Sequence, residues 1–148
     1  MDASLRERAV RLLARREHSR AELARKLAAH AESAEALDAV LDDLVARRLL
    51  SDARYVEARL NVRAARFGNA RLVQELRTQC VDDELVRSAL AECEEEWVRA
   101  SQVWRRRFGD RPASEEAAGR AKEMRFLMSR GFSGETIRRV LRGDLSDD

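Results

Sequence analysis

The chain has 148 residues, enough for one ordinary domain or several small helical units in a row, and its 29 basic and 27 acidic side chains leave a net charge of +2. It has only one proline, six glycines and no run of β-branched residues, which predicts helix throughout. No apolar stretch approaches the roughly eighteen residues of a membrane span, and the charged N-terminus is unlike a signal peptide. We therefore expect a soluble, cytoplasmic protein that does not bind membranes.

Eight helices are predicted in chain order from apolar periodicity and from capping residues. The segment 109–113, which contains Pro112, is the one clear loop. The acidic stretch that ends at Glu96 runs directly into a stripe of Trp97, Trp104 and Phe108, which predicts one long helix. Core packing is favoured for this stripe over base stacking. The predicted helices are residues 3–17, 20–29, 34–48, 52–66, 69–79, 83–107, 114–130 and 134–142.

A short pattern occurs three times along the chain. In each copy, a residue that can cap a helix follows a side chain spaced to contact an apolar residue five positions later, as in a hydrophobic staple. The capping residues are Ser19, Gly68 and Ser133. The staple pairs are His18 with Leu23, Phe67 with Leu72, and Phe132 with Ile137.

This repeat predicts an all-α fold of three tandem three-helix, helix-turn-helix-like repeats that form an elongated, curved array. The first repeat is expected at residues 1–50, and the second at 51–108 with the long connecting helix. The third is expected at 109–148, with a last helix that is short or missing because few residues follow Leu141. Nothing in the sequence suggests more than a monomer.

Sequence patterns typical of catalytic and metal sites are absent. The two histidines and the two cysteines, Cys80 and Cys93, have the spacing of neither a zinc site nor a disulfide framework. The sequence contains no glycine-rich phosphate loop and no nucleophile elbow, and its runs of carboxylates are interpreted as solvated faces. Residues 131–134 fit the glycine loop of KH domains, but that fold needs strands, so we interpret Gly131 as a helix end and Ser133 as a cap. We expect no enzyme activity, no metal and no cofactor.

Arginine makes up nearly all of the basic residues, since only Lys26 and Lys122 are lysines. A GC-rich genome would explain this bias, and so would two-point recognition of phosphate or carboxylate by guanidinium groups. The arginines gather around the turn between the first two helices of each repeat, and they have few asparagine or glutamine neighbours that would read bases. Taken one at a time, most of these arginines are explained as part of the solvent-exposed face of an amphipathic helix. The candidate binding residues are Arg15, Arg16, Arg20, Arg25, Lys26, Arg63, Arg66, Arg71, Arg105, Arg106, Arg107, Arg125, Arg130, Arg138 and Arg139.

Four segments resemble the RecX family of recombination regulators and occur in the same order as in that family. Together they span most of the chain. They are residues 11–23 (RLLARREHSRAEL), 50–55 (LSDARY), Gly68 with 71–76 (RLVQEL), and 125–133 (RFLMSRGFS). The sequence departs from the family where Arg66-Phe67-Gly68-Asn69 replaces a turn that usually contains Gly-Pro, and where Cys80 replaces a usual glycine. These departures affect turns and therefore bear on the contacts that the turns make.

The resemblance implies three tandem three-helix repeats, no catalytic activity, and binding to the recombinase RecA and to its filament on DNA. It also implies that the protein lowers the recombinase, ATPase and coprotease activities of RecA, and so regulates DNA repair and recombination. The alternative hypothesis, based on the arginine clusters, is a helical module that binds single- or double-stranded DNA through its phosphates without sequence preference. The third hypothesis is an enzyme, and the residues give it little support.

Overall fold

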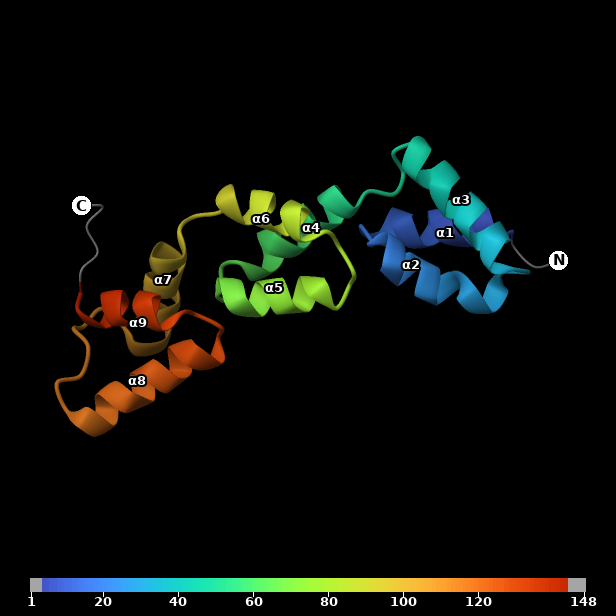
Figure 1. Cartoon of the computed structure of the whole chain (residues 1–148). Coiled ribbons are helices and arrows are strands. Elements are labelled where there is room, and N and C mark those ends of the chain that lie inside the picture. The colour runs from blue at the N-terminus through green and yellow to red at the C-terminus, as the bar shows by residue number, and fades with distance from the viewer. Residues whose placement is uncertain (1–3, 144–148) are drawn as a thin grey trace. The chain divides into compact units, whose positions relative to one another are not determined.

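The structure is a computed structural model that describes residues 4–143. Over this range the chain forms nine α-helices and one short 3-10 helix, with no β-strand (Figure 1). The predicted all-α class is confirmed, although the sequence predicts eight helices. The helices are α1 (Leu5–Arg15), α2 (Arg20–Leu27), α3 (Ala34–Ala46), α4 (Asp52–Arg63), α5 (Asn69–Arg77), α6 (Asp83–Ala91), α7 (Glu96–Phe108), α8 (Ala117–Ser129) and α9 (Gly134–Leu141), and the 3-10 helix η1 (Ala28–His30) follows α2.

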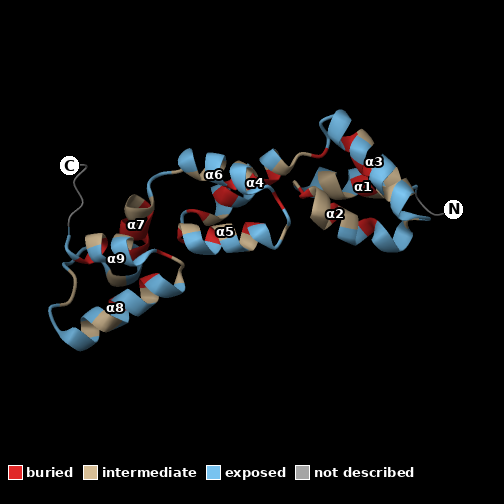
Figure 2. Ribbon diagram, viewed as in Figure 1, coloured by how far each residue is buried: buried red, intermediate tan, exposed pale blue. Residues whose placement is uncertain are grey.

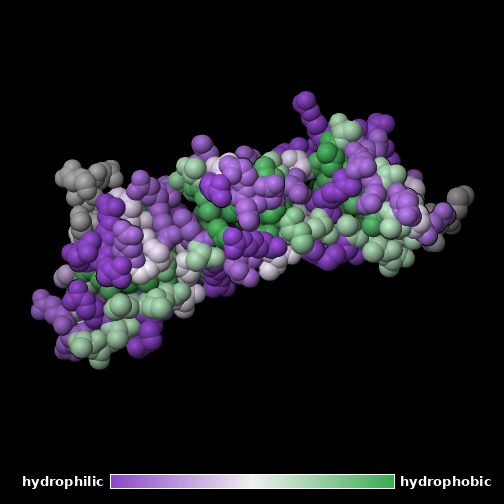
Figure 3. Space-filling model, in the orientation of Figure 1, coloured by the Kyte–Doolittle hydropathy of each residue, from purple (hydrophilic) through white to green (hydrophobic). Residues whose placement is uncertain are grey.

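The chain divides into two compact units. The N-terminal unit consists of Met1–Ala58 and Leu76–Val86, and the C-terminal unit consists of Arg59–Glu75 and Arg87–Asp148. Each unit has its own apolar core, in which buried positions face the neighbouring helices (Figure 2). Hydrophilic side chains cover most of the face drawn in Figure 3, with smaller apolar patches between them.

The core of the N-terminal unit lies between α1, α2 and α3. Serine residues begin all three helices: Ser4, Ser19 and Ser33 each accept a hydrogen bond from a backbone N–H in the first turn. The core side chains are Ala9, Leu23, Leu27, Leu41, Leu44 and Leu50. Within α2 and α3 the core leucines are three or four residues apart, which is the spacing of one apolar face and the signal that predicted these helices.

The turn between α1 and α2 is held by a buried histidine. His18 is 1% exposed; its Nδ1 lies 3.0 Å from the carbonyl oxygen of Arg16, and its Nε2 lies 3.0 Å from the ammonium nitrogen of Lys26. A carbonyl only accepts and an ammonium only donates, so the ring is neutral, with its proton on Nδ1. Burial lowers the pKa of His18 below its ordinary value.

The buried, neutral His18 makes the stability of the N-terminal unit dependent on pH. Below about pH 6.5 the unfolded chain binds a proton at this residue more readily than the folded chain does. The contribution of neutral His18 to stability is therefore fully present above that pH, and it is lost as the pH drops toward the folded-state pKa. We expect thermal denaturation, followed by circular dichroism, to show a larger loss of Tm between pH 7.5 and pH 5 in the wild type than in His18→Phe. His30→Gln, at an exposed histidine, should keep the wild-type loss; equal losses in all three proteins would contradict this role.

The C-terminal unit has a core between α7, α8 and α9. Trp104 belongs to it, while Phe108 is half-buried against it and Trp97 is half-buried, which confirms core packing as the role of the first two. The helix that completes this core, α7, precedes the pair α8 and α9 in the chain rather than following it. The buried side chains are Ala100, Val103, Trp104, Leu127, Phe132, Ile137, Val140 and Leu141.

The prediction of one long helix over residues 83–107 is wrong, because α6 ends at Ala91 and α7 begins at Glu96. Glu95 has an extended backbone, with φ −55° and ψ 148°. Several glutamates follow one another here, and like charges one turn apart disfavour helix. The break places Glu96 where its carboxylate accepts from the backbone N–H groups of Asn69, at 3.2 Å, and Ser133, at 2.8 Å, which begin or precede α5 and α9.

Two turns of the C-terminal unit pack directly against each other, namely the turn before α5 and the turn before α9. The backbone N–H of Gly68 donates to the carbonyl of Arg130 at 2.7 Å. A Cβ added to Gly68 would lie 2.3 Å from the carbonyl oxygen of Gly131, so only glycine fits. Gly131 itself has φ +87°, which confirms the left-handed helix end predicted for it.

Arg99 of α7 connects the same region from the inside. Its guanidinium is buried, and it donates to the carbonyl oxygens of Ala64 (3.1 Å), Phe67 (3.0 Å) and Glu94 (3.0 Å), and also to the side chain of Asn69. Burial lowers the pKa of this guanidinium. It satisfies carbonyl groups at the end of α4 that lack partners within their own helix.

The two departures from the family pattern have different structural outcomes. Asn69 begins α5 and is held by Arg99 and Glu96, so the turn forms without proline. Cys80, in the turn between α5 and α6, has φ +56°, a left-handed conformation that costs a residue with a Cβ about 1–2 kcal/mol. The glycine usual at this position would avoid that cost.

Candidate functional site

Arginines of the C-terminal unit gather around the staple residue Phe67. The guanidinium carbons of Arg63 and Arg71 lie 4.4 and 4.2 Å from the centre of the Phe67 ring, and those of Arg66 and Arg130 lie 5.6 and 5.4 Å from it. These distances are typical of cation–π contacts, which hold a guanidinium plane in place. The paired turns therefore bring together residues that are far apart in sequence.

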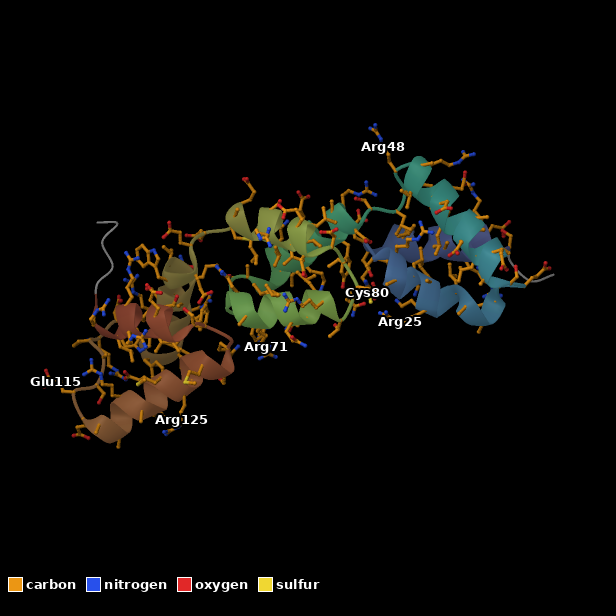
Figure 4. All side chains as sticks on the ribbon, viewed as in Figure 1. Arg25, Arg48, Arg71, Cys80, Glu115 and Arg125 are labelled. Atoms are coloured by element: carbon orange, nitrogen blue, oxygen red, sulfur yellow. The ribbon has the colours of Figure 1, made fainter. Side chains whose placement is uncertain are left out.

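A carboxylate neutralises two of these arginines. Arg63 forms a two-point ion pair with Glu75, with nitrogen–oxygen distances of 2.7 and 2.6 Å, and Arg71 reaches the same carboxylate at 3.5 Å. The hydrogen bond from Arg63 is the largest cause that holds the pKa of Glu75 below its ordinary value. Arg71, labelled in Figure 4, also donates to the carbonyl of Ser129 at 3.3 Å. We assign Arg63 and Arg71 to holding the turn.

Arg66 and Arg130, together with two arginines of α7, line a hollow of about 380 Å³, which we call the arginine pocket. None of its arginines forms an ion pair with any carboxylate in the part of the chain that the structure describes. The pocket is formed by Arg66, Val103, Arg106, Arg107, Phe126 and Arg130.

Aromatic and backbone groups orient the guanidinium groups of the pocket. Arg107 and Arg130 lie 5.9 and 5.2 Å from the ring centre of Phe126, and Arg106 donates to the carbonyl of Ala65. A guanidinium group held this way loses less freedom when it binds, and it offers paired N–H groups to one carboxylate or phosphate. The lining contains no asparagine or glutamine, so the pocket can bind anions but has no groups suited to reading base edges.

The remaining candidates of the C-terminal unit lie outside the pocket. Arg105 is 4.0 Å from Asp110, and Arg139 lies 3.9 Å over the ring of Trp97. Arg125 is exposed on α8 and projects away from the ribbon in Figure 4, and Arg138 is exposed on α9. The structure therefore brings together four of the ten candidates found in this unit, because Arg66, Arg106, Arg107 and Arg130 all line the arginine pocket.

The candidates of the N-terminal unit are mostly engaged within it. Arg16 forms a two-point ion pair with Glu22 at 3.0 and 2.6 Å, which lowers the pKa of that carboxyl, and Arg20 contacts Asp42 at 2.8 Å. Ser19 caps α2 as predicted, while the Glu22 side chain pairs with Arg16. Arg25 donates to the side chain of Gln79 at 2.6 Å, Lys26 contacts His18, and Arg15 forms no ion pair within residues 4–143.

Sequence reasoning missed the apolar floor of the pocket and the buried Arg99. Val103 and Phe126 belong to ordinary helical apolar patterns, and nothing in those patterns marks the residues that border a hollow. Arg99 lies apart from the three-arginine run on the same helix. Nothing in the sequence pattern distinguishes it from a solvent-exposed arginine. The stripe of Trp97, Trp104 and Phe108 gave no signal for Arg99, because at about 100° per residue Arg99 lies on the opposite side of the helix.

Two further findings concern the classes of site considered from the sequence. Within residues 4–143, no group of three or more histidine, cysteine, aspartate or glutamate side chains is arranged to hold a metal ion. No helix over the same range is long and apolar enough to cross a membrane.

Comparison with known proteins identifies the repeats. Three family models, described as the first, second and third three-helix domains of RecX, match residues 6–44, 51–90 and 94–141. The chain is 47% identical to the regulatory protein RecX of Herminiimonas arsenicoxydans over 143 residues, which cover 96% of this chain and 93% of that protein. It is 53% identical to the RecX of Leptothrix cholodnii over 140 residues, covering 94% and 88% of the two chains.

The fold is also that of a solved structure. The crystal structure of RecX from Lactobacillus salivarius superposes with a TM-score of 0.78 and covers 96% of both chains, at 18% sequence identity. The matches to the family models extend over all three groups of helices, α1 to α3, α4 to α6 and α7 to α9. The chain therefore belongs to the RecX family of regulatory proteins.

Proposed function

We propose that this protein binds RecA and the RecA–DNA filament and lowers its recombinase, ATPase and coprotease activities. Membership of a family of regulatory proteins supports a regulatory role without catalysis. The observation that supports a contact surface most strongly is the arginine pocket, in which oriented guanidinium groups have no carboxylate partner among residues 4–143.

The chemistry of the pocket favours a protein partner. Its floor is apolar, since Val103 and the half-buried ring of Phe126 lie beneath the guanidinium groups. Arginine and aromatic residues are enriched at the centres of protein interfaces, where an apolar contact accompanies the charge pair. We expect aspartate or glutamate side chains of RecA, next to an apolar residue, to occupy this pocket. A chain held there would lower ATP hydrolysis by blocking filament extension or by promoting filament disassembly.

The experiment is a titration of RecA ATP hydrolysis on single-stranded DNA with the wild-type protein and a pocket variant. The variant is Arg66→Gln, Arg107→Gln and Arg130→Gln, which keeps the Arg106 contact with the Ala65 carbonyl. We expect half-inhibition to need at least about tenfold more of the variant, equivalent to about 1.4 kcal/mol of binding free energy. The titration is run at two salt concentrations, because loss of charge pairs weakens the salt dependence.

The matched control removes three positive charges outside the pocket, at Arg59, Arg120 and Lys122, all exposed and without an ion pair within residues 4–143. Changed to glutamine, it should inhibit at nearly the wild-type concentration. Absence of inhibition by the wild type at equimolar amounts would refute the proposed function. Equal loss in the control and the pocket variant would remove the pocket from it.

A further inference from the structure

A second basic surface lies on α1 of the N-terminal unit. This helix carries arginines of two kinds. Arg6 pairs with Asp43, and the residue that follows the helix, Arg16, pairs with Glu22. Arg8, Arg11 and Arg15 form no ion pair within the described residues, and we call these three the arginine stripe.

The stripe borders a hollow of about 290 Å³ between α1 and the end of α2. Lys26 and His30 face it from the other side, and Leu12 and Leu27 form its floor. Lys26 is partly engaged, because its ammonium contacts His18 at 3.0 Å and Glu22 at 3.9 Å. The hollow opens to solvent, and its volume leaves room for a hydrated anionic group.

The spacing of the stripe suits an anion that repeats. Arg8, Arg11 and Arg15 occupy one face of α1, separated by about 4.5 and 6 Å along the helix axis at 1.5 Å per residue. Three cations in a line, without carboxylates between them, attract a linear polyanion more strongly than a single anion. The flexible arginine side chains can adjust to the phosphate spacing of a nucleic-acid strand.

The surroundings favour a phosphate backbone over a protein. Leu27 is only 1% exposed, Leu12 is half-buried, and the lining contains no aromatic residue, so the hollow lacks the aromatic anchor that is typical of protein interfaces. It also contains no asparagine or glutamine for reading base edges. Its polar side chains are all cationic or imidazole groups, and no carboxylate lines it. Interfaces with nucleic acids are more positively charged than those with proteins.

We propose that the arginine stripe binds the phosphate backbone of a nucleic acid without sequence preference. The arginine pocket has a different role under the proposed function, because its floor contains the aromatic ring of Phe126, which the hollow beside the stripe lacks. The chain then has two separate anion sites, one in each unit, for two kinds of partner. The stripe does not depend on RecA binding, and its test contains no RecA.

The test measures binding of a fluorescent thirty-nucleotide oligothymidylate, and of a duplex of equal length, by anisotropy at several salt concentrations. The stripe variant is Arg8→Gln, Arg11→Gln and Arg15→Gln. Each phosphate contact contributes about 0.7 to the slope of log affinity against log salt on a single strand, so we expect the slope to fall by about two. Arg8→Lys, Arg11→Lys and Arg15→Lys should keep the wild-type slope, because charge is retained.

Control proteins and competitors separate the possible outcomes. Arg59→Gln, Arg120→Gln and Lys122→Gln in one protein remove the same charge and should leave the slope within about one of the wild type. Thermal melting should be unchanged in the stripe variant, since its three side chains form no ion pair within residues 4–143. A wild-type slope in the stripe variant would overturn the proposal. So would displacement of the oligonucleotide by poly-glutamate as readily as by unlabelled oligothymidylate, which would indicate carboxylate recognition instead.

Discussion

Gly68→Ala is expected to lower the free energy of unfolding of the C-terminal unit by about 3 kcal/mol or more. The new Cβ would lie 2.3 Å from the carbonyl oxygen of Gly131 and 2.5 Å from the backbone nitrogen of Phe132. Backbone atoms cannot rotate away as a side-chain end can, so the two turns must separate. Separation would break the hydrogen bond from Gly68 to Arg130 and would move Arg66 and Arg130 apart.

Tryptophan fluorescence during urea unfolding measures this effect directly, because Trp97 and Trp104 are the only tryptophans and both lie in the C-terminal unit. Gly134→Ala is the matched control: its Cβ would meet only the end of the flexible Arg138 side chain, at 3.3 Å. We expect the control to change the unfolding free energy by less than about 1 kcal/mol. A Gly68→Ala protein as stable as this control would show that the two turns are not in contact.

Arg99→Leu should also lower the stability of the C-terminal unit by about 3 kcal/mol. Arg99 is 3% exposed and donates to the carbonyl oxygens of Ala64, Phe67 and Glu94. Leucine fills part of the volume but leaves these carbonyls without a donor, and each unsatisfied buried group costs about 1–3 kcal/mol. Lysine reaches fewer acceptors, so Arg99→Lys should fall between leucine and the wild type.

The control for Arg99 is Arg105→Leu on the same helix, since Arg105 is exposed and only 4.0 Å from the exposed Asp110. This change should alter the urea midpoint by the equivalent of about 0.5 kcal/mol or less. If both leucine variants unfolded at the same urea concentration, the buried hydrogen bonds of Arg99 would contribute nothing net. The comparison thus isolates burial from loss of charge.

The helices and their turns could be predicted because their causes are local. Capping by Ser19 and Ser133 and the left-handed Gly131 depend on residues within one turn of sequence. The break before Glu96 could not be predicted, since it depends on N–H groups of Asn69 and Ser133 that are distant in the chain. Periodicity alone continues through such a break.

The candidate arginines could be found from the sequence, but their roles could not be assigned. The sequence does not distinguish Arg63 from Arg66, yet Glu75 forms an ion pair with Arg63 and not with Arg66. Likewise, Arg16 is paired and Arg15 is not, although they are adjacent. Ion pairing of an arginine with a carboxylate depends on how the helices pack. The order of charges along the chain does not reveal that packing.

A direct binding measurement shows whether the arginine pocket recognises RecA on DNA. The labelled protein is titrated with single-stranded DNA, bare or coated with RecA and a slowly hydrolysed ATP analogue, for the wild type and for the variant with glutamine at Arg66, Arg107 and Arg130. We expect the wild type to prefer the coated filament, and the variant to lose most of this preference while binding bare DNA as before. Equal affinity of the wild type for bare and coated DNA, or an unchanged preference in the variant, would contradict recognition by the pocket.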